Sequence, residues 1–231
     1  VLFRSTYNGE TNTLHSADGG WTLAEDPAYH LDETSCNTMR TALAALNAKR
    51  QLTEEPGEDY GFTADSLTVT VTAAGETDTF TFGAENAATG DIYLKKAGDD
   101  ALYTVAGTKA SCFEVRKTDL FGAFNPAGLT SSAIEAVTLT KNGETLTPEL
   151  TTELLSALSS YVTAQTTDGD PAGRKELAAA VVQTADSTKT LTYYEGMDNY
   201  YLTVAGDTSL YTVDGSTVQT ILAADAAEAD S

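Results

Sequence analysis

Cysteine, histidine and basic side chains are scarce in this sequence. Its 231 residues include two cysteines, two histidines and 13 Lys+Arg, against 34 Asp+Glu. Two cysteines do not make a disulfide framework for a chain of this length. Neither C-x-x-C nor H-E-x-x-H occurs, and these are common spacings of zinc ligands. The cysteine count therefore leaves the cellular compartment open, and the sequence predicts no zinc site.

Long apolar segments are also missing. No run approaches the roughly 20 residues that a transmembrane helix needs, and no stretch has the pattern of a secretory signal peptide. The sequence begins at Val1 rather than at Met. We therefore expect any membrane attachment to come from an N-terminal anchor that lies upstream of this sequence.

Acidic residues are abundant and evenly spread. The net charge is −21; residues 1–115 carry 7 basic and 18 acidic side chains, and residues 116–231 carry 6 and 16. A surface this negative repels the phosphates of nucleic acids and anionic lipid head groups. The hydrophobic fraction of 41% is typical of globular proteins. We expect a soluble globular protein that does not bind nucleic acid.

The chain contains an internal repeat. Residues 93–107 (YLKKAGDDALYTVAG) and 201–215 (YLTVAGDTSLYTVDG) are identical at ten of fifteen positions without a gap. Upstream, residues 6–11 and 140–145 both centre on Asn-Gly, a strong hairpin signal because a type I′ turn needs positive φ at both central residues. The two halves are therefore expected to superpose as repeats.

A helix follows the hairpin in the first half. Asp32 is a suitable N-cap, and Lys49 and Arg50 suit a helix C-terminus, which predicts a helix over residues 34–49. Its apolar residues recur at three- and four-residue spacing. The predicted buried face consists of Cys36, Met39, Leu43 and Leu46.

A corresponding helix is predicted in the second half. Thr147 is the expected cap, and Pro148 takes the first helical position, where a missing N–H costs nothing. The predicted buried stripe consists of Leu150, Leu154, Leu155, Leu158 and Tyr161.

Strand alternation follows each helix. In the first half, alternate residues from Leu67 to Val71 share one face, and the chain turns at Ala74-Gly75 and returns through Phe80 and Phe82. In the second half, a strand over residues 180–184 returns through Leu191 and Tyr193, although residues 178–182 also fit a helix. Short helices near residues 111–121 and 216–226 are expected to close the two halves.

These patterns together predict an α+β fold. It consists of two tandem ββ-α-ββββ repeats, each a mostly antiparallel sheet packed on one long helix. The breaker-rich segment 122–128 marks the boundary, so the expected units are residues 1–125 and 126–231. We expect them to pack as two lobes of one body, because one helix covers each sheet incompletely.

Residues that could support catalysis are few. His15, Ser16 and Asp18 supply the residue types of a catalytic triad, but they fall where a hairpin turn is expected, and no G-x-S-x-G elbow occurs. His30 is expected to cap or stack locally. The sequence therefore predicts no catalytic residue, no cofactor and no enzyme activity.

Metal binding and disulfide formation rest on few residues. No metal site is predicted; the acids at Asp168-Gly169-Asp170 are expected to form turns, yet this loop is the first place to look for an exception because its carboxylates could meet a calcium ion. Cys36 is expected to be a buried structural thiol. A bridge between Cys36 and Cys112 stays open, since it requires a proximity that sequence does not show.

Paired tyrosines provide the one candidate binding surface. Alternation along a strand puts one ring of each pair on each face of the sheet. One ring per pair is expected in the core, and the other either lines an open face for sugars or peptides or occupies a half-buried sheet, where Tyr has high propensity. The candidate residues are Tyr193, Tyr194, Tyr200 and Tyr201.

Several motifs occur in a familiar order. Asp18-Gly19-Gly20-Trp21 precedes the first helix, Tyr60-Gly61-Phe62 precedes a hairpin, and Phe82-Gly83 and Tyr103-Thr104-Val105 follow. In order and spacing the chain resembles the bacterial family named domain of unknown function 4340, over most of residues 5–121, with residues 134–222 as a degenerate second copy. Phe62 and Asp65 depart from the usual Leu and Pro of that pattern.

The resemblance implies an extracytoplasmic protein, tethered on the outer side of the bacterial cytoplasmic membrane by one N-terminal helix. It also implies genes beside those of ABC-type exporters related to gliding components, and it provides no catalytic or ligand-binding residues. The leading hypothesis is a non-enzymatic cell-envelope protein that assists an ABC-type export complex, with transporter subunits or other envelope proteins as partners. The alternatives are a surface module that binds glycans or peptides and, third, a hydrolase.

Overall fold

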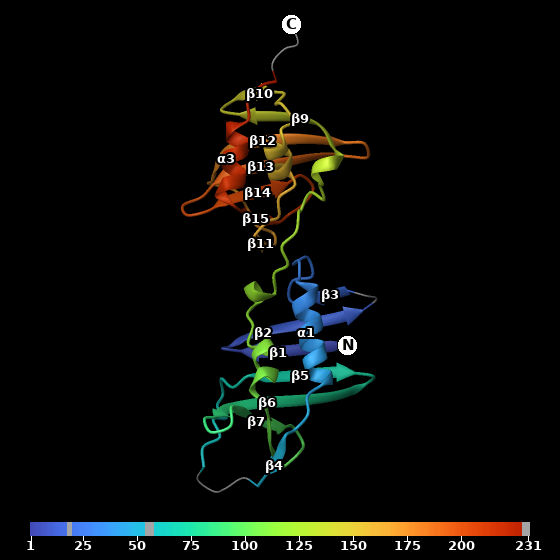
Figure 1. The fold of residues 1–231 in the computed structure, drawn as a ribbon, viewed down its shortest axis with the longest axis vertical. Coiled ribbons are helices and arrows are strands. Elements are labelled where there is room, and N and C mark those ends of the chain that lie inside the picture. Colours follow the sequence, from blue (N-terminus) through green and yellow to red (C-terminus); the bar gives the residue numbers. More distant parts are fainter. Residues whose placement is uncertain (18–19, 54–57, 228–231) are drawn as a thin grey trace. The chain divides into compact units, whose positions relative to one another are not determined.

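The computed structural model describes residues 1–17, 20–53 and 58–227 of the chain. The chain divides into two compact units, Val1–Gly122 and Ala123–Ser231, and each is an antiparallel sheet with helices (Figure 1). The fold is therefore a mixed α and β one in which strands predominate.

The first unit is built on an eight-stranded sheet. Its strands are β1 (Leu2–Tyr7), β2 (Glu10–Ala17), β3 (Gly20–Leu23), β4 (Arg50–Leu52), β5 (Thr68–Ala73), β6 (Glu76–Asn86), β7 (Asp91–Lys96) and β8 (Leu102–Ala106). Their order is β3-β2-β1-β5-β6-β7-β8-β4, and neighbours are antiparallel. The α-helix α1 (Glu33–Ala44) runs across one face of this sheet (Figure 1).

The second unit is built on a seven-stranded sheet. Its strands are β9 (Ile134–Lys141), β10 (Glu144–Leu146), β11 (Ala164–Thr166), β12 (Lys175–Thr184), β13 (Thr188–Glu195), β14 (Tyr200–Val204) and β15 (Leu210–Val213). Their order is β10-β9-β12-β13-β14-β15-β11. Two short helices, α2 (Thr152–Leu158) and α3 (Gly215–Ala223), contact each other in this unit.

The predicted Asn-Gly hairpins are present in both units. Asn8 and Gly9 have φ of 49° and 77°, and Asn142 and Gly143 have φ of 51° and 79°. Both dipeptides thus adopt the left-handed conformation that a type I′ turn requires. Residues 178–182, for which a helix was the alternative, lie within strand β12.

The first helix begins where predicted but ends earlier. The side chain of Asp32 accepts hydrogen bonds from the backbone N–H of Thr34 and Ser35, both at 3.1 Å, as an N-cap does. The helix ends at Ala44 rather than at residue 49. The cause is a competing strand. The N–H of Lys49 donates to the carbonyl of Thr104 at 2.7 Å, and the residues that follow form strand β4, which pairs with β8.

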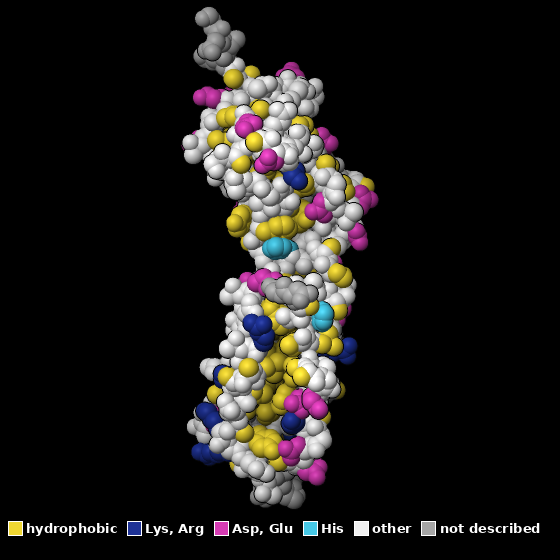
Figure 2. All heavy atoms as spheres, turned by 90° about the vertical axis from the view of Figure 1, so that its right-hand side faces the viewer, with side chains coloured by type: hydrophobic (Ala, Val, Ile, Leu, Met, Phe, Trp, Pro, Cys, Tyr) yellow, Lys and Arg dark blue, Asp and Glu magenta, His cyan; other side chains and the backbone are white. Residues whose placement is uncertain are grey.

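The shorter helix leaves part of its apolar face open. Cys36 and Met39 are buried, as predicted, but Leu43 and Leu46 are only partly buried. The core beneath them is centred on Phe113, whose ring centroid lies 5.6 Å from that of Phe3 and 6.1 Å from that of Phe82. In the space-filling view, hydrophobic side chains are visible in a hollow on one side of the first unit (Figure 2).

The predicted helix of the second unit was wrong at its start. The helix begins at Thr152 with Thr151 as its N-cap. The backbone at the expected cap pairs elsewhere, because Thr147 accepts a hydrogen bond from the N–H of Ala227 at 2.9 Å and Pro148 forms a bridge with Ala226. Leu154 and Leu158 are buried as predicted, whereas Tyr161 lies beyond the helix and is exposed. The long helix that the sequence predicts is thus reduced to the seven residues of α2. The short closing helix predicted near residues 216–226 is present as α3.

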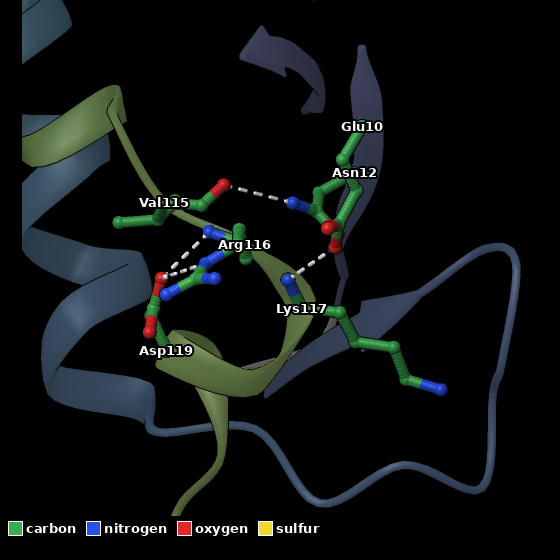
Figure 3. Close-up of polar contacts among 6 residues, drawn as sticks. All are labelled: Glu10, Asn12, Val115, Arg116, Lys117 and Asp119. Atoms are coloured by element: carbon green, nitrogen blue, oxygen red, sulfur yellow. Dashed lines mark hydrogen bonds and ion pairs between the residues drawn. The ribbon is translucent and has the colours of Figure 1, made fainter. Parts of the chain in front are cut away.

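The two units close differently. Helix α3 closes the second, while 3₁₀ turns at Gly107–Lys109, Ser111–Phe113 and Lys117–Leu120 close the first. In the first unit, strand β2 holds the closing segment (Figure 3): Asn12 donates to the carbonyl of Val115 at 3.1 Å, and Glu10 accepts from the N–H of Lys117 at 2.6 Å. The Nζ of Lys117 also lies 2.6 Å from a carboxylate oxygen of Asp26.

Candidate functional site

The four candidate tyrosines lie on strands β13 and β14, which pair directly. Tyr194 is opposite Tyr201, Tyr193 is opposite Leu202, and Glu195 is opposite Tyr200. Because side chains alternate along a strand, Tyr193 and Tyr200 lie on the helix-bearing face and Tyr194 and Tyr201 on the other. The two rings of each pair thus lie on opposite faces of the sheet.

The two tyrosines of the helix-bearing face have structural surroundings. Tyr193 is fully buried, and this burial raises the pKa of its hydroxyl. The hydroxyl of Tyr200 accepts a hydrogen bond from the side chain of Gln219 on α3 at 3.4 Å. A Cβ at Gly215 would lie 3.2 Å from the Tyr200 ring, so the ring packs closely against the start of α3.

Tyr201 on the opposite face is covered by its neighbours. The guanidinium carbon of Arg174 lies 4.5 Å from the centre of its ring, in the range of a cation–π contact, and Arg174 also donates to the carbonyl of Asp170 at 2.7 Å. A Cβ at Gly196 would lie 2.4 Å from the ring, so only glycine fits beneath it. The Tyr201 ring is therefore held in place and does not offer a free face for stacking.

A depression surrounds this stacked pair. Its wall includes Arg174, Lys175, Glu195, Met197 and Tyr201. Lys175 and Glu195 form an exposed ion pair at 3.5 Å, and the Met197 side chain at the tip of the β13–β14 hairpin is fully exposed. We name Arg174, Tyr194, Met197 and Tyr201 the hairpin surface. It combines a cation, two aromatic rings and an exposed thioether.

Tyr93 of the first unit, which corresponds to Tyr201 in the internal sequence repeat, is contacted by a different kind of segment. The Tyr60 ring lies 4.9 Å from that of Tyr93 in an edge-to-face arrangement, and the N–H of Ala84 donates to the Tyr60 carbonyl at 2.8 Å. A Cβ at Gly83 would lie 2.3 Å from that carbonyl oxygen, and one at Gly61 would lie 2.5 Å from the Ala84 Cβ. The Tyr60-Gly61-Phe62 and Phe82-Gly83 motifs thus serve a backbone crossing that requires both glycines.

The residues singled out for chemistry do not assemble into a site within the described ranges. His15 belongs to strand β2, opposite Leu2 and Thr22, so the expected hairpin turn was placed too early: β2 continues to Ala17, which pairs with Gly20 of β3. Asp18 and Gly19 lie outside the described residues. His30 lies before α1, and its carbonyl accepts from the N–H of Gly122 at 3.0 Å. No group of three or more His, Cys, Asp or Glu side chains that could hold a metal occurs in that part of the chain.

The remaining candidates have local roles. Cys36 and Cys112 are both free thiols, and burial raises the pKa of Cys36 to about 12, which keeps it protonated and unreactive near neutral pH. In the Asp168-Gly169-Asp170 loop, Asp168 has a φ of 52° and the Asp170 side chain accepts from the N–H of Ala172 at 2.8 Å. This is the geometry of an Asx-turn.

The fold and the crossing motifs define a strand-rich α and β protein with two antiparallel sheets. Residues 21–176, more than half of the chain, match the family described as Domain of unknown function (DUF4340). The chain belongs to this family. The match starts in β3, later than the expected residue 5, and continues past the first unit to the beginning of β12.

Other comparisons add no relatives. No curated protein and no solved structure gives a significant match to the chain. Among the described residues, no helix is long and apolar enough to cross a membrane.

Proposed function

We propose that this chain is a non-enzymatic, extracytoplasmic protein that docks onto an ABC-type export complex at the bacterial cell envelope. Membership of the DUF4340 family supports this proposal, because resemblance to that family implies an extracytoplasmic place and genes beside exporters of this type. The observation that carries the docking role is the hairpin surface, with its exposed Met197 beside the Arg174–Tyr201 stack.

The side-chain types of the hairpin surface favour a protein partner. Tyr, Met and Arg are enriched at protein–protein interfaces, and Tyr and Arg are frequent among the residues that dominate binding energy. A flexible thioether such as that of Met197 adapts to an apolar socket. Arg174 and Tyr201 are already stacked in the free protein, so ordering them on binding costs little.

Glycan binding, the alternative function, is supported by one feature of the same surface. Tyr194 lies on the face opposite the helices and is partly exposed, so its ring is available to a sugar. Tyr201, the second aromatic ring of that face, is covered by Arg174. One available ring favours a protein partner over a glycan, and a glycan array that gave specific binding would reverse this preference.

Co-purification with defined partners tests the docking role. The tagged full-length protein is expressed together with the ABC transporter subunits encoded beside its gene, and their recovery in detergent is measured. Met197→Asp is expected to reduce recovery at least tenfold, because it places a charge in an apolar contact. Tyr161→Asp is the matched control at another exposed residue of the second unit. Equal recovery of both variants, or a family without neighbouring transporter genes, would contradict the proposal.

We also infer that the two units are tandem copies of one ββ-α-βββββ plan, with one more strand after the helix than the sequence predicts, and that β3 in the first copy and α3 in the second are additions to it. The strand order β2-β1-β5-β6-β7-β8-β4 of the first sheet matches β10-β9-β12-β13-β14-β15-β11 of the second, position by position. The Asn-Gly turns of the first hairpins correspond as well. An experimental structure in which Tyr93 and Tyr201 faced opposite sides of their sheets would contradict this inference.

A further inference from the structure

A cavity remains between α1 and the sheet of the first unit. Because α1 ends at Ala44, apolar side chains toward one end of strands β5 and β6 are only partly covered. The cavity has a volume of about 280 Å³ and lies in the unit whose hollow is visible in Figure 2. Its apolar walls include Phe3, Val71 and Phe80 from the sheet and Leu43 from the helix. Trp21 lines it as well, and this is the only tryptophan of the chain.

Two charged side chains line the cavity, and they differ in their pairing. Asp78 is neutralised by Lys96, whose Nζ lies 2.7 Å from its carboxylate. Arg40 is exposed, and its guanidinium carbon lies 6.0 Å from the centre of the Trp21 ring. Within the described ranges Arg40 makes no ion pair. The cavity is thus lined by apolar side chains, by Asp78 in its ion pair with Lys96, and by the Arg40 guanidinium, which has no ion-pair partner among the described residues.

We propose that this cavity binds a single-chain amphiphile, with its alkyl chain against Val71 and Phe80 and its anionic head group at Arg40. Burying the chain removes apolar surface from water, and a guanidinium binds a carboxylate or phosphate through two parallel hydrogen bonds. The negative charge of the whole protein acts weakly here, because charges more than about 8 Å away are screened at physiological salt.

The size of the cavity sets the length of the chain. Pockets for drug-sized ligands measure about 300–1,000 Å³, and this one lies just below that range. A medium-length alkyl chain is therefore the expected ligand. This site does not depend on the hairpin surface of the second unit, so either proposal can fail without the other.

Tryptophan fluorescence provides a direct measurement, because Trp21 is the single tryptophan and lines the cavity. Octanoate and decanoate are titrated into the 231-residue chain, below their micelle concentrations. We expect a saturable change in emission, with decanoate bound roughly tenfold more tightly because it buries two more methylene groups. A change that does not saturate, or equal affinities for the two chains, would overturn the assignment of the cavity.

Substitutions of two residues at the opening of the cavity test the apolar part of the site independently of Arg40. Ala44→Phe and Ala73→Phe each fill the cavity from an exposed position and are expected to weaken decanoate binding at least tenfold, with circular dichroism confirming that each variant is folded. Unchanged binding in a folded variant would contradict the site. Two variants are used so that one misfolded protein does not decide the outcome.

The head-group assignment has its own control. Wild-type protein is expected to prefer decanoate over neutral decanol at least tenfold, and Arg40→Gln is expected to abolish this preference. Arg50→Gln makes the same change of charge on β4, at an exposed residue outside the cavity lining, and is expected to preserve it. Equal binding of decanol and decanoate by the wild type would show that the head group is not recognised.

Discussion

The hydroxyl of Tyr211 donates a hydrogen bond to the carboxylate of Asp207, four residues earlier, at 2.6 Å. The same bond joins Tyr103 to Asp99 in the first unit at 2.7 Å. In both hairpins the other carboxylate oxygen accepts from a backbone N–H two residues after the aspartate, at Ala101 and at Ser209. The repeated Gly-Asp-x-x-Leu-Tyr segment thus makes one turn twice.

Removing this bond should weaken the second unit more than the first. Tyr211 is buried, and burial together with the bond to Asp207 raises its pKa to about 12. Tyr211→Phe leaves the carboxylate short of one donor, and we expect a loss of about 1–2 kcal/mol in the free energy of unfolding. Tyr103→Phe should have a smaller effect, because the bond between Tyr103 and Asp99 is exposed to water, whereas that between Tyr211 and Asp207 is partly buried. Urea denaturation measures both, and a larger effect of Tyr103→Phe would contradict this account.

Substitutions along α1 should report how far its buried face extends. Met39 is buried, so Met39→Ala is expected to cost about 2–5 kcal/mol. Leu43, which the sequence pattern places on the buried face, is only partly covered at the cavity. Leu43→Ala should therefore cost less than about 2 kcal/mol, at the low end of such changes. Thermal or urea denaturation of the two variants compares them, and equal losses would mean that Leu43 is fully packed.

The backbone crossing at Gly83 should not tolerate a side chain. A Cβ there would meet the Tyr60 carbonyl oxygen at 2.3 Å, so we expect Gly83→Ala to destabilise the first unit by about 1–3 kcal/mol. Gly20→Ala is the matched control, since the nearest atom to its Cβ lies 3.9 Å away, and it should stay within about 0.5 kcal/mol of the wild type. If both substitutions proved neutral, the segment around Tyr60 could not lie on β6 as described.

The N-cap of α1 should make stability depend on pH in the acid range. Hydrogen bonds from Ser35 and from the backbone N–H of Thr34 and Ser35 lower the pKa of Asp32 below its ordinary value. Because the folded pKa is the lower one, the contribution is complete above the unfolded value of about 3.9 and is lost as pH falls through the folded pKa.

The Asp32→Ala variant tests this linkage. We expect it to be about 1 kcal/mol less stable than the wild type at pH 7, with the difference shrinking as the pH falls below about 4. Urea denaturation across pH 2.5–7 gives this difference at each pH. A difference that stayed constant over the whole range would mean that the carboxylate charge does not contribute to the cap.

Local signals predicted much of the fold, whereas pairing between distant segments decided the rest. The Asn-Gly turns and the alternation around Val69 depend only on adjacent residues, and the structure has them as expected. The end of α1 was mispredicted because β4 is recruited by β8, some fifty residues later. The start of α2 was mispredicted because the backbone at Pro148 pairs with Ala226 near the end of the chain.

The hairpin surface was likewise predictable only where the signal in the sequence is local. Alternation along β13 and β14 sufficed to place the tyrosines on their faces. That Arg174 covers Tyr201 could not be read from the sequence, because the two residues lie on separate segments that meet only in the folded unit. Gly196 was the available signal, since a glycine across from an aromatic residue in a hairpin often makes room for its ring.

Photo-crosslinking in living cells tests the docking proposal most directly. A benzoylphenylalanine residue is introduced at Met197 of the full-length protein and, as a control, at the exposed Tyr161. We expect a crosslink from position 197 to a subunit of the neighbouring ABC transporter and none from position 161. A transporter that assembles with the protein but gives no crosslink at position 197, or equal crosslinks from both positions, would contradict the docking proposal.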